Sequence, residues 1–225
     1  METPKEQFIA LLRKTGREGI EDLIAYLDSP DSDWFTAPAS SRFHGAYPGG
    51  LVDHSLAVWN EFVRLYQAYQ DKVNISYESM AIMALLHDLC KINTYIPTEK
   101  SRKTAAGWEK YQGYDKHEEY LFGGHGSKSV FIASRFIKLT DEEAAAINCH
   151  MATWEDGRTY VTSEVYHKYP AAWMLHAADE AATFIIKKYR CSELGVSHLP
   201  SADSYYNTEI SGLVTVFPDQ FLYHC

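Results

Sequence analysis

The sequence predicts an all-α fold with a small β-hairpin insertion, on three observations. Apolar residues recur at helical spacing along most of the chain, as at Trp59 and Val63, one helical turn apart. Helix-start signals are present, and Thr140 with Glu143 has the pattern of a capping box. Helical periodicity disappears between residues 93 and 123, where the hairpin is expected.

The elements follow from periodicity and from the residues at their ends. Thr3 can cap the first helix, and Pro4 suits its first turn. A turn signal at Asp28-Ser29-Pro30 ends the second helix, and residues 31–50 are expected to form a loop. The predicted helices cover residues 3–15, 17–27, 53–71, 76–90, 126–137, 140–149 and 170–188, and the predicted hairpin covers residues 104–114 with a turn at Gly107.

A single domain is expected over residues 1–225. A chain of 225 residues, of which 46% are apolar, can fill one substantial core. The N-terminal helices and the irregular segment after Arg190 are expected to pack on a motif-bearing core at residues 43–182.

Charge and cysteine usage exclude several classes of protein. The formal net charge of −9, from 30 acidic and 21 basic residues, disfavours a general nucleic-acid-binding surface, which needs a basic face. No apolar run approaches the length of a membrane span, and the amphipathic N-terminus has no signal-peptide core. The four cysteines show no metal-ribbon or disulfide spacing, so a reduced, cytoplasmic protein is expected.

The stretch at residues 80–91, MAIMALLHDLCK, organises the predicted site. It is an apolar run that looks like a buried helix and ends by presenting His87 and Asp88 side by side. A carboxylate in such surroundings is costly unless it is paired or bound to a metal. Further candidate ligands, each far enough away in sequence to belong to another helix, are His54, His125, His150 and Asp179.

Local motifs accompany these residues. Residues 43–54 read FHGAYPGGLVDH, similar to the H-x-A-Y-x-G-G-L-x-x-H segment of HD domains attached to bacterial 3′–5′ exoribonucleases and their relatives. LHDLCK at residues 86–91 matches the HD-x-G-K signature, with Cys90 where glycine is usual. The chain thus resembles the HD-domain superfamily of metal-dependent phosphohydrolases. The other matching segments, at the family's third and fourth histidines and its closing L-H-x-A-D, are GHG at 124–126, CHM at 149–151 and LHAAD at 175–179.

The resemblance implies an HD-domain helical bundle with two divalent metal ions. Asp88 would bridge the two ions and act in catalysis together with Lys91. Mixed imidazole and carboxylate ligands suit Mn, Fe, Co, Ni or Zn better than Mg or Ca. A third ion is not expected, because Cys149 precedes a single histidine where several relatives carry a His-His pair. The implied ligands are His54, His87, Asp88 and Asp179 for one ion, and Asp88, His125 and His150 for the other.

Each ligand has a structural alternative. His54 can be a buried polar residue, and His125 can make a structural hydrogen bond in a glycine loop. His150 at a helix end also interacts well with the helix dipole, and Asp179 can pair with a basic side chain. His176, three residues before Asp179, is expected to support the site through a hydrogen bond.

Cationic residues near the motifs suggest an anionic substrate. Lys91 should project just beyond the metals, and His44, Lys128 and Arg135 are further candidate substrate contacts, with a solvated surface as the alternative for the cations. Lysines interleaved with aromatics over residues 99–116 either clamp a nucleotide by stacking and phosphate contact, or form an ordinary exposed hairpin. Cys90 and Cys149 adjoin proposed ligands and are interpreted as packing residues.

The expected function is metal-dependent hydrolysis, through metal-bound hydroxide, of a nucleotide or other small phosphoester. One alternative is an HD-type mixed-valent di-iron oxygenase, because myo-inositol oxygenase and phosphonate-cleaving HD oxygenases have a similar ligand order. Another is a non-catalytic nucleotide-binding HD module. The sequence indicates no membrane partner and leaves the oligomeric state open.

Overall fold

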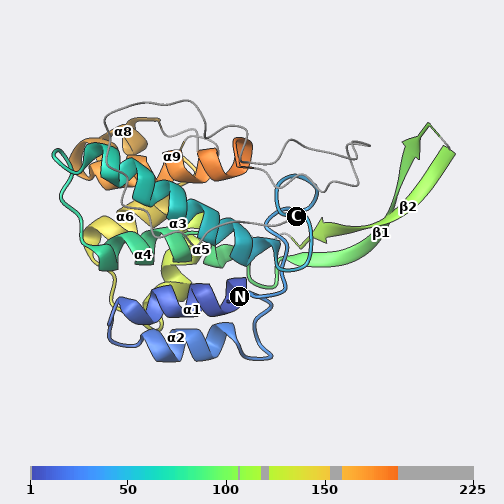
Figure 1. Ribbon diagram of the computed structural model, residues 1–225, viewed down its shortest axis with the longest axis horizontal. Coiled ribbons are helices and arrows are strands. Elements are labelled where there is room, and N and C mark those ends of the chain that lie inside the picture. The colour runs from blue at the N-terminus through green and yellow to red at the C-terminus, as the bar shows by residue number, and fades with distance from the viewer. Residues whose placement is uncertain (1, 106, 118–121, 153–158, 187–225) are drawn as a thin grey trace. The chain divides into compact units, whose positions relative to one another are not determined.

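The computed structural model describes residues 2–105, 107–117, 122–152 and 159–186 (Figure 1). They belong to one compact unit, Met1–Lys188, and the expected packing of the segment after Arg190 lies outside them. The described elements are α1 (Pro4–Lys14), α2 (Ile20–Leu27), α3 (Gly50–Tyr69), α4 (Tyr77–Leu86), the 3-10 turn η1 (Leu89–Lys91), β1 (Tyr95–Thr104), β2 (Gly107–Lys116), α5 (His125–Ser134), α6 (Asp141–Cys149), α8 (Thr159–Lys168) and α9 (Pro170–Phe184).

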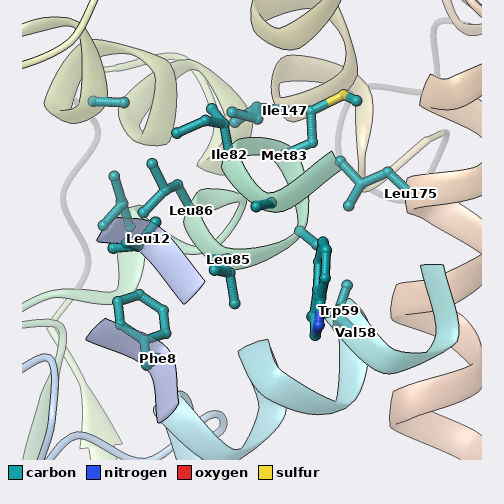
Figure 2. Close-up of a cluster of buried hydrophobic side chains, with 14 of the residues drawn as sticks. Phe8, Leu12, Val58, Trp59, Ile82, Met83, Leu85, Leu86, Ile147 and Leu175 are labelled. Carbon is teal, nitrogen blue, oxygen red and sulfur yellow. The ribbon is translucent and has the colours of Figure 1, made fainter. Parts of the chain in front are cut away.

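The architecture is mostly helical with one antiparallel pair of strands, as the sequence predicts. Helix α4 lies at the centre, and its residues from Met80 to Leu86 are all buried, as expected for a helix that is apolar on every side. Helix α3 packs against α4 and α9, while α1 packs against α3 and α4. Figure 2 shows α4 side chains among those of α1, α3, α6 and α9. This core fixes the end of α4 that carries His87 and Asp88.

Two capping boxes confirm predicted helix starts. Thr3 and Glu6 form one at α1, and Thr140 and Glu143 form the other at α6. In each box the threonine side chain accepts from a backbone N–H, and the glutamate accepts from the backbone of the threonine. Both starts were therefore readable from local sequence alone.

Helix α3 begins at Gly50, earlier than predicted, and the loop before it contains glycines in conformations that other residues do not favour. Gly49 has φ of 83°, a left-handed conformation that glycine adopts without strain. A Cβ at Gly50 would lie 2.0 Å from the carbonyl oxygen of Gly45. The close approach of the two chain segments brings the 43–49 loop against the helix that carries His54.

Helix α4 ends at Leu86, so the prediction that it continues to Cys90 is wrong. His87 is the C-cap residue, and Asp88 has φ of −103° and ψ of 19°, outside the helical region. The chain then makes the short turn η1. Because the helix stops there, the last carbonyl groups of α4 are available to side chains.

The hairpin is confirmed and is longer than predicted. β1 and β2 pair antiparallel from Tyr95 opposite Lys116 to Thr104 opposite Gly107. In Figure 1 it extends away from the helices, and Trp108 near its tip is 76% exposed. Helix α8 was not predicted. None of the described helices is long and apolar enough to cross a membrane.

Candidate metal centre

Five of the six predicted ligands come together at the centre of the helical unit. His54 comes from the first turns of α3, His87 and Asp88 from the end of α4, His150 from the C-cap of α6 and Asp179 from α9. The first four are at most 6% exposed, and the Asp179 side chain is 14% exposed. Four helices that pack on one another thus each deliver a polar side chain to a single buried point.

The distances between these groups are equal to or slightly longer than those of a ligand set. His54 Nε2 lies 3.0 Å from Asp179 Oδ1 and 3.5 Å from Asp88 Oδ2. His87 Nε2 lies 3.3 Å from Asp88 Oδ2, and His150 Nε2 lies 3.7 Å from Asp88 Oδ1. Two atoms bound to one ion at about 2.1 Å are themselves about 3.0–3.4 Å apart at right-angled to tetrahedral geometry.

One ring nitrogen in each of three central histidines makes no hydrogen bond with the described residues. Within the described part of the chain, Nε2 of His54, His87 and His150 are buried without a hydrogen-bond partner, although carboxylate oxygens lie nearby. Buried polar atoms normally have partners, so three unused nitrogens at one point require an explanation. A bound cation supplies one. Groups able to hold an ion are His54, His87 and Asp88, and His87, His150 and Asp179.

Backbone contacts fix which nitrogen faces the centre. His87 Nδ1 lies 2.8 Å from the Ala84 carbonyl oxygen, and His150 Nδ1 lies 2.7 Å from that of Ile147. A carbonyl can only accept, so each Nδ1 carries the proton and donates it. In the neutral ring each Nε2 therefore carries a lone pair, the tautomer that a metal ligand requires. Burial lowers the pKa of His87, but the charge of Asp88 outweighs burial and raises it, which favours a proton on its Nε2 until an ion replaces that proton.

Charges at the centre keep the carboxylates ionised. Burial raises the pKa of Asp88, but the charges of Lys91 and His87 outweigh it and hold that pKa well below the usual range. Burial likewise opposes ionisation of Asp179, yet His54 and His87 lower its pKa overall. Burial, with the charge of His87, lowers the pKa of His150 to about 4. At neutral pH the two carboxylates are thus anionic and His150 is neutral.

His125 is placed beside this centre and belongs to neither of the two groups found among the described residues. It begins α5, with Nδ1 3.4 Å from Cys90 Sγ and Nε2 3.4 Å from Lys116 Nζ. Cys90, interpreted from the sequence as a packing residue, therefore lies between His125 and Asp88. Cys90 stands two residues after Asp88 in the sequence, and this closeness was the available signal that its thiol could face the site.

The predicted substrate contacts divide into two groups. His44 is close, with its ring 4.7 Å from that of His54, and Lys91 Nζ lies 2.7 Å from Asp88 Oδ2. Lys128 lies in the first turns of α5, three residues after His125, on the side of the helix end that adjoins the centre. Arg135 is not at the site, which corrects the sequence prediction. Its guanidinium lies over the Tyr26 and Phe136 rings. His125 is the first residue of α5 and Arg135 follows its last residue, so this ten-residue helix separates the two by about 15 Å.

Three basic side chains of the hairpin have acidic partners on the hairpin itself. Lys100 pairs with Asp115, and Lys110 pairs with Glu99. Arg102 likewise pairs with Glu109. These pairs favour the exposed-hairpin interpretation for the distal part of the hairpin. Its base does reach the site, through Lys116 and His125.

Two further residues support the centre. His176 Nδ1 lies 2.8 Å from the His150 carbonyl oxygen and donates to it, the supporting hydrogen bond expected from the sequence. Tyr95, which sequence reasoning missed, begins β1, and its hydroxyl lies 3.4 Å from the Ala39 carbonyl oxygen. Burial raises the pKa of Tyr95, so its hydroxyl stays protonated and can donate to that carbonyl group. No pattern in the sequence marks Tyr95, because its position depends on where the hairpin starts.

No family model, curated protein or solved structure matches the chain. The likeness to HD domains consequently rests on the five motif segments and their order. The geometry of the centre is independent of that likeness, because it follows from the positions of the side chains.

Proposed function

We propose that the chain is a metal-dependent phosphohydrolase that cleaves a nucleotide or another small phosphoester with two divalent transition-metal ions. The observation that carries the proposal is the convergence of three unpartnered imidazole nitrogens on two ionised carboxylates. The donor set fits Mn, Fe, Co, Ni or Zn, which accept mixed nitrogen and oxygen ligands. The residues that would hold the ions are His54, His87, Asp88, His150 and Asp179.

The ions would supply Lewis acidity toward phosphoryl oxygens and a water made acidic at neutral pH. Residues of the chain orient the ligands and exclude bulk water. Ala84 and Ile147 hold His87 and His150 in the required tautomer through their carbonyl groups. The apolar side chains of α4 keep bulk water from one side of the centre, which strengthens electrostatic interactions within it.

The position and charge of Lys91 favour an anionic substrate. Its side chain is 14% exposed, and its ammonium group lies 2.7 Å from Asp88 at the edge of the centre. Burial lowers the pKa of Lys91, but the charge of Asp88 outweighs burial and raises it, so the group stays charged. A fixed ammonium there can stabilise charge that develops on phosphoryl oxygens. His44, whose ring nitrogens are buried, would line the same side.

Anaerobic phosphate release tests the proposal. The metal-free full chain would be loaded with Mn²⁺, Co²⁺ or Zn²⁺ and assayed on nucleotides and generic phosphodiesters. We expect release that Asp88→Ala abolishes and Asp71→Ala retains, since Asp71 is an exposed carboxylate paired with Lys72. Substrate-dependent O₂ uptake by the Fe form on polyols or phosphonates, with no anaerobic cleavage by any metal form, would favour the di-iron oxygenase instead.

A further inference from the structure

The two oxygens of Asp88 face different partners. Oδ2 faces His54, His87 and Lys91. Oδ1 faces His150 Nε2 at 3.7 Å and Cys90 Sγ at 3.9 Å. His150 is fully buried, and its Nε2 has no hydrogen-bond partner among the described residues. The Oδ1 side thus combines an unused imidazole nitrogen, a carboxylate oxygen and a buried sulfur.

The spacing on the Oδ1 side is close to that of ligands on one ion. A thiolate and an oxygen ligand of a tetrahedral ion lie about 3.6 Å apart, from metal–sulfur and metal–oxygen bonds of about 2.3 and 2.1 Å, and two nitrogen or oxygen ligands lie about 3.4 Å apart. Cys90 Sγ lies 3.9 Å and His150 Nε2 lies 3.7 Å from Asp88 Oδ1, both slightly wider than these values. Cys90 belongs to neither of the two ligand groups found among the described residues, so its sulfur must move closer when an ion binds. Cys90 is 3% exposed, and its backbone N–H donates to Ser129 Oγ, which holds the residue in place.

His125 presents a proton to this sulfur. The ammonium of Lys116 has no lone pair, so in its 3.4 Å contact His125 Nε2 is the acceptor. The proton of a neutral His125 ring is then on Nδ1, the atom 3.4 Å from Cys90 Sγ. Nδ1 therefore donates toward sulfur, and it does not offer a lone pair to an ion in this arrangement. A donor aimed at sulfur is the usual support for a thiolate ligand.

We propose that Cys90 is a thiolate ligand of the second metal position, together with Asp88 Oδ1 and His150 Nε2, and that His125 supports the sulfur by a hydrogen bond. The proposal rests on the metal centre of the proposed function and replaces His125 as a ligand. Binding breaks the Sγ–H bond, releases the proton to solvent and forms an Sγ–metal bond, with no change of oxidation state. Thiolate ligation favours Zn²⁺, Fe²⁺ or Co²⁺ over Mn²⁺ at this position.

A coordinating cation deprotonates a bound thiol. The sulfur is therefore expected to respond to metal loading.

Co²⁺ absorption tests the proposal without any substrate. The metal-free full chain would be titrated with Co²⁺ to two equivalents, and a thiolate-to-cobalt charge-transfer band would be sought in the near ultraviolet. We expect the band in the wild type and its loss in Cys90→Ser. Matched controls are Cys149→Ser, a buried cysteine next to His150, and the double variant Cys191→Ser with Cys225→Ser, all of which should keep it.

His125→Ala separates a supporting role from a ligand role. We expect it to retain two Co²⁺ per chain and the band, whereas loss of one equivalent would return His125 to the ligand set and overturn the proposal. A wild type that binds Co²⁺ without the band would also overturn it, while leaving the phosphohydrolase proposal intact. Failure to bind Co²⁺ at all would overturn both. If Cys90→Ser does not fold, a band that persists in Cys149→Ser and in the double variant assigns the thiolate to Cys90 by elimination, whereas loss of the band in either control would overturn the proposal.

Discussion

At the scale of single residues, the same device orients two of the candidate ligands. His87 and His150 each follow the last residue of a helix, and each donates from Nδ1 to a carbonyl three residues earlier. The last four carbonyls of an α-helix lack intrahelical partners, so they are free to accept. The ends of α4 and α6 thereby set the tautomer of the ring that follows. A helix that continued past either histidine would remove this acceptor.

Lys91→Ala should lower phosphoester kcat/KM about ten-fold or more. The ammonium beside Asp88 is placed to stabilise transition-state charge, and a ten-fold loss corresponds to about 1.4 kcal/mol. Steady-state kinetics of the metal-loaded variant measure this, with metal content determined in parallel and expected to be unchanged. Lys72→Ala, which removes an exposed lysine paired with its neighbour Asp71, serves as the control. Kinetics equal to wild type would leave Lys91 only a structural partner of Asp88.

At the scale of elements, one buried glutamate joins three segments. Glu143, in the first turn of α6, accepts from Arg17 Nη2 at 2.7 Å and from Ser79 Oγ at 2.8 Å. Arg17 lies between α1 and α2, and Ser79 lies in the first turn of α4. The glutamate also caps its own helix through Thr140. Because a buried charge must be fully partnered, this network fixes the relative placement of helices that frame the centre.

Glu143→Gln should reduce the free energy of unfolding by about 3 kcal/mol at pH 7, since it leaves Arg17 with less compensation. Burial raises the pKa of Glu143, but the hydrogen bond from Arg17 and the backbone of Thr140 lower it overall, below 4.5. The contribution of ionised Glu143 to stability is therefore full above pH 4.5 and is lost as pH falls through the pKa of Glu143 in the folded protein. Urea unfolding at pH 7 and at acidic pH measures both effects.

Glu142→Gln is the matched control for this pH dependence. Burial and then the charge of Glu143 raise the pKa of Glu142, so its ionisation opposes folding. Removing that charge should stabilise the protein slightly at neutral pH, and the gain should vanish as pH falls. A stability loss in Glu143→Gln that did not shrink at acidic pH would show that the loss is one of packing, with no contribution from charge.

At the scale of the molecule, sequence patterns predict what is local. The capping boxes, the buried α4 and the hairpin follow from neighbouring residues, and the motifs identify five side chains that converge. What could not be predicted depends on distant contacts. The end of α4 at Leu86 and the sulfur of Cys90 between Asp88 and His125 arise only when α5 packs on η1. Arg135 was misplaced because sharing a helix with His125 does not imply nearness to the same site.

The whole fold should be stabilised by the ions it is proposed to bind. Buried carboxylates and unpartnered imidazoles are costly in the metal-free protein, and a ligand that binds only the native state adds about 2.7 kcal/mol at a hundred times its Kd. For a domain of this size that corresponds to a rise in Tm of about 5–10 °C. Thermal unfolding with and without Co²⁺ or Zn²⁺ measures the rise in Tm, and a chelator added to the loaded protein should reverse that rise. Asp179→Asn should remove most of the rise and Asp71→Asn none of it. An equal rise in both variants would place the stabilising ion elsewhere.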